Sequence, residues 1–153
     1  MNTLRPLMSL APAPSSAPVS PSAPAPCKPS LAETRGWEVS VQPSFVPERS
    51  DPAARTWIFS YKIKITNKSD APARLISRHW LIVSAHGQRD EVRGDGVVGS
   101  QPRLETGESF TYQSFCPLPT SWGTMEGSYS MRTDDGEHFD IAVGRFYLVG
   151  PRE

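Results

Sequence analysis

The residues of this sequence that most resemble a chemical site are three glycines, Gly94, Gly96 and Gly99, which follow the spacing G-x-G-x-x-G. In dinucleotide-binding folds this spacing follows a parallel strand and opens a helix whose N-terminus receives a pyrophosphate. Here Pro102 stands shortly after the last glycine and residues 102–107 read as a turn, so no helix is expected to begin there. We therefore interpret the glycines as structural, providing positive φ angles and close backbone approach at the edge of a sheet.

An anion-binding loop is the alternative interpretation of the same segment. Successive backbone amides that point outward attract a phosphate group, and Arg93 and Arg103 flank the glycines in the sequence. On this hypothesis Gly94, Gly96 and Gly99, together with these two arginines, bind a phosphate, a pyrophosphate or a metal-nucleotide complex.

No other group of residues predicts catalysis. The histidines are His79, His86 and His138, and none has a neighbouring ligand at the H-x-x-x-H or C-x-x-C spacing, so we assign no metal site. Cys116 has no histidine near it in sequence, and its neighbour Pro117 favours packing at a strand end over nucleophilic attack. We assign no catalytic residue and no cofactor, and we predict that the protein is not an enzyme.

An acidic cluster surrounds His138 and consists of Asp134, Asp135, Glu137 and Asp140. These carboxylates could offer oxygen ligands to a hard cation. The favoured interpretation is a turn followed by a solvated strand face, because Asp and Gly residues in succession are typical of tight turns.

Composition limits the class of partner. The chain has 153 residues, with 16 Lys and Arg against 16 Asp and Glu, so its formal net charge is zero. A nucleic-acid binder usually carries an excess of basic residues, so no nucleic-acid partner is expected. No segment approaches the roughly 18 to 20 consecutive apolar residues of a membrane span, so no membrane partner is expected either. Cys27 and Cys116 form no disulfide framework, which favours a reducing compartment, and we predict a cytoplasmic protein.

The N-terminal part of the chain is rich in proline, alanine and serine. Half of the 16 prolines fall before residue 30, with almost no large apolar residue among them. Such a segment cannot form a packed core, so we predict a disordered, polyproline-like tail over residues 1–34. A docking role for the tail is the less favoured alternative, and prolines at positions 6, 12 and 14 argue against a signal peptide.

From Trp37 onward the sequence alternates between apolar and polar residues in short runs, which indicates antiparallel strands. Residues 57–65 should place one face in a core and one in water, and residues 75–85 should form a central strand covered on both sides, with Trp80 as its core anchor. We expect a hairpin turn at residues 134–136 and a β-bulge at Gly144. The expected strands are 37–45, 57–65, 75–85, a weak strand at 91–93, 109–115, 125–131 and 139–149.

About seven strands and no amphipathic helix predict an all-β domain over residues 35–153. The number and spacing of the strands are typical of an immunoglobulin or fibronectin type III-like β-sandwich. A domain of this size buries enough surface to fold without metals or disulfides.

Several motifs in a fixed order resemble the ApaG family, a bacterial family whose domain also occurs in eukaryotic F-box and polymerase-interacting proteins. The resemblance covers roughly residues 35–150 and leaves out the proline-rich tail. His79 stands where the family often has Tyr. The motifs are Tyr61-x-Ile63-x-Ile65-x-Asn67, Leu75-x-x-Arg78-His79-Trp80-Leu81-Ile82, Glu91-Val92-x-Gly94-x-Gly96-Val97-Val98-Gly99-x-x-Pro102, Gly107-x-x-Phe110-x-Tyr112-x-Ser114 and Gly123-Thr124-Met125-x-Gly127-x-Tyr129-x-Met131, followed by the strand over 139–146.

The resemblance implies a fibronectin type III-like sandwich of two antiparallel sheets. The family name is associated with cobalt and magnesium resistance, but a chain without a membrane span is not itself expected to export ions. The occurrence of the domain in unrelated eukaryotic proteins implies a binding module.

The order of charges along the sequence and the open edges of a sandwich both favour binding to another protein chain. Residues 49–93 hold nine basic and four acidic side chains, whereas residues 94–153 hold four and nine, which hints at a bipolar surface. Open sheet edges can also be extended by another chain. We therefore expect a non-enzymatic protein-binding module with an unknown protein partner, indirectly linked to cobalt and magnesium tolerance, and we expect self-association through a sheet edge. The small-ligand hypothesis for residues 94–99 is the alternative.

Overall fold

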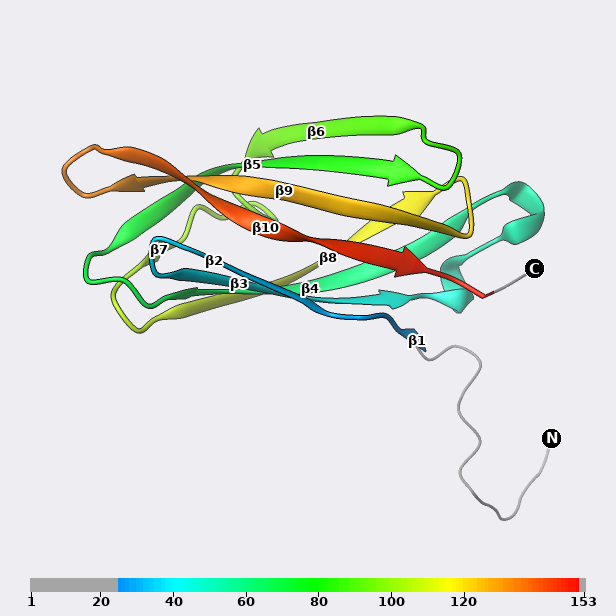
Figure 1. Cartoon of the computed structure of the whole chain (residues 1–153), viewed down its shortest axis with the longest axis horizontal. Coiled ribbons are helices and arrows are strands. Elements are labelled where there is room, and N and C mark those ends of the chain that lie inside the picture. The colour runs from blue at the N-terminus through cyan, green and yellow to red at the C-terminus, as the bar shows by residue number, and fades with distance from the viewer. Residues whose placement is uncertain (1–24, 152–153) are drawn as a thin grey trace, which may run out of the picture.

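The structure, a computed structural model, describes residues 25–151 as two antiparallel sheets stacked face to face (Figure 1). The first sheet contains, in order, β3 (Trp37–Phe45), β4 (Trp57–Asn67) and β8 (Ser109–Leu118), with β1 (Ala25–Pro26) and β2 (Ser30–Thr34) both paired to β3. The second contains β10 (His138–Val149), β9 (Trp122–Thr133), β5 (Ala73–Ser84) and β6 (Arg89–Asp95), with β7 (Arg103–Leu104) paired to β5. Two short 3-10 turns, η1 (Pro47–Arg49) and η2 (Pro52–Ala54), join β3 to β4.

The all-β sandwich is confirmed, and all seven predicted strands are present. The pattern missed β7 and the pair β1 and β2, all of them short. In the part of the chain that the structure describes, no helix is long and apolar enough to cross a membrane.

Residues 25–34 correct one expectation, because they form β1 and β2 and do not belong to an unstructured tail. Leu31 is the only large apolar residue in β2 and is 66% exposed, so apolar alternation could not reveal this strand. Backbone pairing to β3 forms it instead. The Ser30 hydroxyl also donates to the Gly144 carbonyl (3.2 Å), and the Thr34 hydroxyl accepts from the Ala142 amide (3.1 Å). Residues 1–24 of the predicted tail lie outside the described residues.

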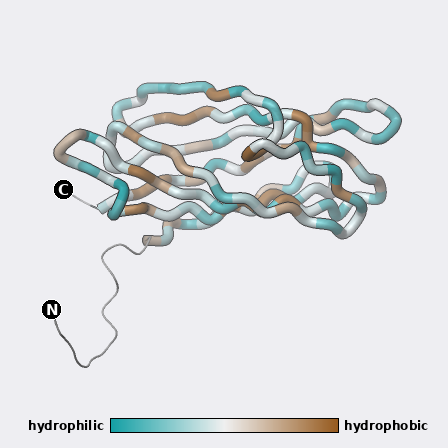
Figure 2. Tube along the Cα trace, turned by 180° about the vertical axis from the view of Figure 1, so that it is seen from behind, coloured by the Kyte–Doolittle hydropathy of each residue, from teal (hydrophilic) through white to brown (hydrophobic). Residues whose placement is uncertain are grey.

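The core lies between the sheets and follows the alternation in the sequence. Phe59, Ile63 and Ile65 of β4 are fully buried, while the intervening Lys62 and Lys64 are exposed. Alternating apolar and hydrophilic segments run along the strands, and the end loops are largely hydrophilic (Figure 2). The predicted one-sided burial of this strand is confirmed at Lys62 and Lys64, whereas Ser60, which was expected on the exposed face, is buried.

Trp80 is the core anchor that the sequence predicted. It is 3% exposed, and its ring lies 5.6 Å from Tyr61, 6.2 Å from Tyr129 and 6.0 Å from Phe146, measured between centroids. These edge-to-face contacts join β4, β5, β9 and β10, so one side chain ties both sheets together.

The expectation that residues 75–85 are covered on both sides is wrong. β5 is central in its sheet, but only one face packs on the other layer, and outward residues such as His79 and Leu81 are half-buried. A register shift between Leu75 and Ser77 moves apolar residues of both parities to the inner face. The bulge therefore produces apolar residues at both odd and even positions, the sequence pattern that a strand buried on both sides would also have.

The hairpin and the bulge in the last strand are confirmed. β9 and β10 are joined through residues 134–137, where Gly136 has a φ of 95°. The register jumps from Val143 opposite Gly127 to Phe146 opposite Met125, so Gly144 and Arg145 oppose one residue. Arg145 then donates to Glu126 across the bulge at 2.7 Å.

Candidate binding cleft between the two sheets

The sandwich is closed along one side and open along the other. On the closed side β10 packs against β2, through the two hydrogen bonds made by Ser30 and Thr34. On the open side β6 ends one sheet and β8 ends the other, and the two strands do not pair. This open side is where the core can be reached from outside.

A cleft of about 500 Å³ lies between β6 and β8. Its floor is made of core side chains, including Tyr61, Trp80 and Met125, and its walls are residues 90–92 of β6 and 114–117 of β8. Polar and apolar atoms both contribute to the lining, because the hydrophobic core meets the charged strand β6 here.

The two strands that border the cleft differ in charge. Five of the seven residues of β6 are charged and all but Gly94 are exposed, which is a usual defence of a free sheet edge. β8 runs for ten residues, SFTYQSFCPL, without a single charged side chain. Since β2 packs against β10, β8 is the free edge within residues 25–151 that is neither covered nor charged.

Arg78 points inward from β5 and lines the cleft. Its Nη1 donates to the backbone carbonyls of Asp95 (3.1 Å) and Gly96 (2.8 Å). Among the described residues no carboxylate lies within ion-pairing distance of this guanidinium. Arg78 therefore holds the glycine segment in place with carbonyl contacts alone and keeps its positive charge unpaired.

At two of the three glycine positions a side chain would clash with neighbouring atoms, which supports the structural interpretation of the motif. A Cβ on Gly94 would lie 2.8 Å from Nη2 of Arg78, so the guanidinium can pack against the backbone there only because the side chain is absent. A Cβ on Gly96 would lie 2.3 Å from the carbonyl oxygen of Ser100, and Gly96 also has a positive φ of 62°. The glycine spacing thus serves contacts within the protein.

Gly99 belongs to a tight turn. Val97 and Ser100 exchange two backbone hydrogen bonds of 2.8 and 2.9 Å, and Val98 and Gly99 between them both have positive φ. The Gly96 amide donates to the Ile76 carbonyl at 2.8 Å. Three amides of the loop therefore already have carbonyl acceptors, and an anion would have to displace these. No helix follows the loop in the described part of the chain, as expected.

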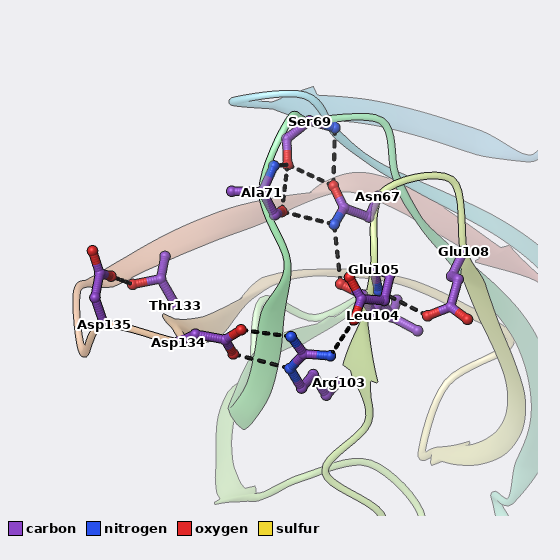
Figure 3. A network of polar contacts seen from close by, with 10 residues as sticks. All are labelled: Asn67, Ser69, Ala71, Arg103, Leu104, Glu105, Glu108, Thr133, Asp134 and Asp135. Atoms are coloured by element: carbon purple, nitrogen blue, oxygen red, sulfur yellow. Dashed lines mark hydrogen bonds and ion pairs between the residues drawn. The ribbon is translucent and has the colours of Figure 1, made fainter.

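The structure brings one of the two flanking arginines to the glycines and not the other. Arg93 lines a depression of about 540 Å³ on the outer face of the second sheet, together with Gly94 and His79. Arg103 instead lies between two carboxylates (Figure 3), donating to Asp134 at 2.9 and 2.5 Å and to Glu105 at 2.7 Å. The hydrogen bond from Arg103 lowers the pKa of Asp134 below its ordinary value.

The acidic cluster is placed at the β9–β10 turn, where Asp134 and Asp135 adjoin Arg74, Arg103 and Arg132. The Thr133 hydroxyl donates to the Asp135 carboxylate. Within the described range no three His, Cys, Asp or Glu side chains lie close enough to hold a metal ion.

The interior near the cleft contains polar groups that burial keeps neutral. The hydroxyls of Tyr112 and Tyr129 are 2.6 Å apart, and burial raises the pKa of both groups, as it does for Tyr61. Burial also raises the pKa of the Cys116 thiol to about 12, so little nucleophilic thiolate exists at neutral pH. This agrees with a packing role for Cys116.

Sequence reasoning missed Arg78 and the edge of β8. An arginine two positions before Trp80 shares its parity and is therefore expected on the same face, which is a signal that could have identified Arg78. The exposure of β8 depends on which strand ends the sheet, and no local pattern carries that information.

Comparisons with known proteins agree with these features. A sequence profile described as the ApaG domain matches residues 47–133. The chain is 53% identical over 122 residues to Protein ApaG of Anaeromyxobacter dehalogenans strain 2CP-C, covering 80% of this chain and 96% of that protein. It is 48% identical over 114 residues to Protein ApaG of Bordetella pertussis, covering 74% of this chain and 87% of that protein.

A solved structure shows the same fold. The crystal structure of a Bordetella pertussis protein described as ApaA aligns with a TM-score of 0.72 and 43% sequence identity, covering 84% of this chain and 98% of that one. The matched region includes the glycine segment and the strands on both sides of the cleft. On the strength of the profile and these relatives, the chain belongs to the ApaG domain family.

Proposed function

We propose that this protein is a non-enzymatic protein-binding module that adds an extended segment of a partner to its first sheet, along β8. The observation that carries the proposal is the free, uncharged edge of β8 beside a cleft that reaches the core. In strand addition, backbone hydrogen bonds supply affinity and pockets for alternate side chains supply specificity.

The cleft supports a preference for particular side chains. A strand paired with β8 would direct every second side chain toward the space between the sheets. Trp80 and Met125 offer that side chain an apolar surface, and the unpaired guanidinium of Arg78 offers it a charge-assisted hydrogen bond. We therefore expect the bound segment to alternate, with apolar residues inward and one carboxylate near Arg78.

On this proposal, any effect of the protein on cobalt or magnesium tolerance would come from the partner that it binds. Within residues 25–151 no cluster of ligands suitable for a metal ion is present, so the chain itself offers no evident site through which cobalt or magnesium would act. A partner engaged by β8 would provide the link that the family name implies.

The alternative is a phosphate-bearing ligand at Gly94, Gly96 and Gly99. We favour the edge of β8 because three amides of the glycine loop already donate to carbonyls and because Arg103 is engaged by Asp134 and Glu105. Titration of the full chain with phosphate, pyrophosphate and ATP, followed by the amide NMR signals of residues 94–100, tests this alternative directly.

A selection from a random-peptide library tests the edge proposal. Selected peptides should alternate in hydropathy and should slow hydrogen exchange of the β8 amides when bound to the full chain. Binding that leaves the β8 amides unprotected would contradict the proposal. Protection that rises with protein concentration and without peptide would identify a second copy as the added strand.

A matched pair of variants gives the specificity control. Thr111 of β8 and Ser40 of β3 both lie directly opposite Lys64 on the outer face of the first sheet. The variant Thr111→Glu places a charge on the edge strand, whereas Ser40→Glu places it on an interior strand beside the same lysine. Peptide affinity should fall about ten-fold or more, roughly 1.4 kcal/mol, in the first variant only. Equal losses would mean that β8 is not the binding edge.

A further inference from the structure

A pair of exposed aromatic side chains lies at one end of the outer face of the second sheet. Trp122 begins β9 and is 45% exposed, and it is paired with Val149 of β10, which is 52% exposed. Tyr147, 46% exposed, lies two residues from Val149 and so on the same face. Exposed large rings gathered in this way indicate a contact surface.

A cavity of about 210 Å³ adjoins this surface and is lined by two tryptophans, Trp57 and Trp122, with His86 and Pro119. The indole Nε1 of Trp57 is buried and has no hydrogen-bond acceptor among the described residues. A buried donor without a partner costs free energy, which a ligand that brings a carbonyl group into this region could recover.

The proline-rich N-terminal segment joins the domain at the same end. The Sγ of Cys27 lies 3.6 Å from the carbonyl oxygen of Val149, the strand partner of Trp122. The Gly150 amide donates to the Ser121 carbonyl at 2.7 Å, so the last strand and the β8–β9 turn meet there. Figure 1 shows β1, the end of β10 and this turn at one end of the molecule.

Residues 11–24 have the chemistry that such a surface accepts. They contain five prolines, with alanine, serine and valine at the other nine positions, and no charged residue. Proline-rich segments in the polyproline II conformation dock on grooves lined by aromatic rings, and their exposed carbonyls accept hydrogen bonds from indole N–H groups. At about 3 Å per residue, such a segment spans roughly 40 Å, which is ample to cross this end of the sandwich.

We propose that residues 11–24 bind across Trp122 and Tyr147 of the same chain, with a backbone carbonyl reaching the indole N–H of Trp57. The site is distinct from the cleft beside β8, so the proposal goes beyond the proposed function and does not depend on it. The N-terminal segment is then an internal ligand, and it would compete with any other proline-rich segment for this surface.

The test uses the indole N–H NMR signals of the four tryptophans in the full chain. One variant replaces Pro12, Pro14, Pro18 and Pro21 with Ser, and its matched control replaces four alanines of the same segment, Ala11, Ala13, Ala17 and Ala23, with Ser. The proline variant should shift the signals of Trp57 and Trp122, while those of Trp37 and Trp80, which are buried elsewhere in the core, stay in place. The alanine control should match the unmodified chain.

A synthetic peptide of residues 11–24, added to the proline variant, should return the two signals toward their original positions in a saturable manner. The variant Trp122→Ala should abolish this response, with the signals of Trp37 and Trp80 reporting that the fold is intact. Identical indole signals in the unmodified chain and the proline variant would overturn the proposal. A difference that grows with protein concentration would place the segment on a second copy and would overturn the intramolecular assignment.

Discussion

At the level of single residues, the buried side chain of Asn67 makes four hydrogen bonds. It is fully buried at the end of β4, and its Nδ2 donates to the carbonyls of Ala71 (2.9 Å) and Leu104 (3.1 Å) (Figure 3). Its Oδ1 accepts from the amide (2.9 Å) and the hydroxyl (2.6 Å) of Ser69. One amide group therefore ties together β4, the following turn and β7.

Replacing Asn67 with Ala should lower the free energy of unfolding by about 2–4 kcal/mol, because it leaves buried backbone groups without partners at about 1–3 kcal/mol each. Urea denaturation measures the change. Its control is Lys68→Ala, where the side chain is exposed and pairs only with Glu38 at 3.0 Å, and the loss should stay within about 0.5 kcal/mol. Similar losses in the two variants would contradict a structural role for the Asn67 amide.

Gly94 offers a second test at this scale. A methyl group there would lie within 3 Å of the Arg78 guanidinium, which must move and give up its bonds to the carbonyls of Asp95 and Gly96. Gly94→Ala should therefore destabilise the chain by about 1.5–3 kcal/mol, the range for hydrogen bonds to a charged group. Thermal or urea unfolding provides the measurement.

The control is Gly144→Ala, whose Cβ would meet its nearest neighbour at an ordinary 3.5 Å, so little change is expected. In the background of Arg78→Met, whose side chain lacks the guanidinium, the cost of Gly94→Ala should shrink. An undiminished cost in that background would show that the clash with Arg78 is not the reason for the glycine.

The glycine motif also shows what the sequence could and could not predict about the site. Its spacing, with Pro102 behind it, was enough to exclude a helical phosphate cradle. The actual neighbour of Gly94 is Arg78, sixteen positions earlier, and this contact exists because β5 and β6 pair in that register. A contact that depends on which strands pair cannot be predicted from the residues next to it in the sequence.

At the level of elements, strands with one solvent-exposed face and one buried face could be predicted from the sequence. The strand β2, which is held by backbone pairing and a few polar contacts, could not. β4 has large apolar residues at every second position and was predicted within two residues of its observed end. β2 has small and polar residues and exists because the edge of β3 accepts it. In β5 a bulge mixed the two parities, so the burial pattern was interpreted as two-sided.

The turn at Val98 yields a prediction for an element. Val98 has a φ of 42° and Gly99 a φ of 81°, which is the geometry of a two-residue hairpin turn that favours Asn-Gly. A left-handed conformation costs an L-residue about 1–2 kcal/mol. Val98 is 60% exposed, so Val98→Asn loses little burial and should raise the free energy of unfolding by about 1 kcal/mol.

Its neighbour provides the contrast. Val97 is fully buried, so Val97→Asn should lower stability by about 2 kcal/mol or more, because a polar amide enters the core. If Val98→Asn destabilises the chain as well, the turn does not carry the strain that its φ implies.

At the level of the whole molecule, strand order decides what the surface looks like. The basic segment 49–93 supplies β4, β5 and β6, and the acidic segment 94–153 supplies β8, β9 and β10, yet each sheet contains strands of both segments. Ion pairs such as Arg103 with Asp134 lie within one half of the chain, whereas β5 and β9 pair across the halves. Segregation of charge along the sequence therefore does not become segregation between layers.

The packing of the whole core gives a prediction for the dependence of stability on pH. Burial raises the pKa of Cys116 from 9.0 to about 12 and raises the pKa values of Tyr61, Tyr112 and Tyr129 above 10.0. In the unfolded chain these groups lose their protons near their ordinary pKa values, while in the folded chain they keep them to higher pH. Their contribution to stability is complete below about pH 9 and is lost as the pH rises toward 12.

Urea denaturation of the full chain at a series of pH values from 7 to 11 measures this loss. The free energy of unfolding should fall steadily above about pH 9, and the fall should be shallower in Tyr112→Phe, which removes one of the buried groups that ionise only on unfolding. Phe110→Leu is the matched control, because the Phe110 ring lies 6.2 Å from that of Tyr112 between centroids and has no ionisable group, so this variant should leave the slope unchanged. If the slope of the unmodified chain stays flat to pH 11, the interior phenols and the thiol reach water in the folded state, and the two sheets are packed less tightly than their aromatic contacts require.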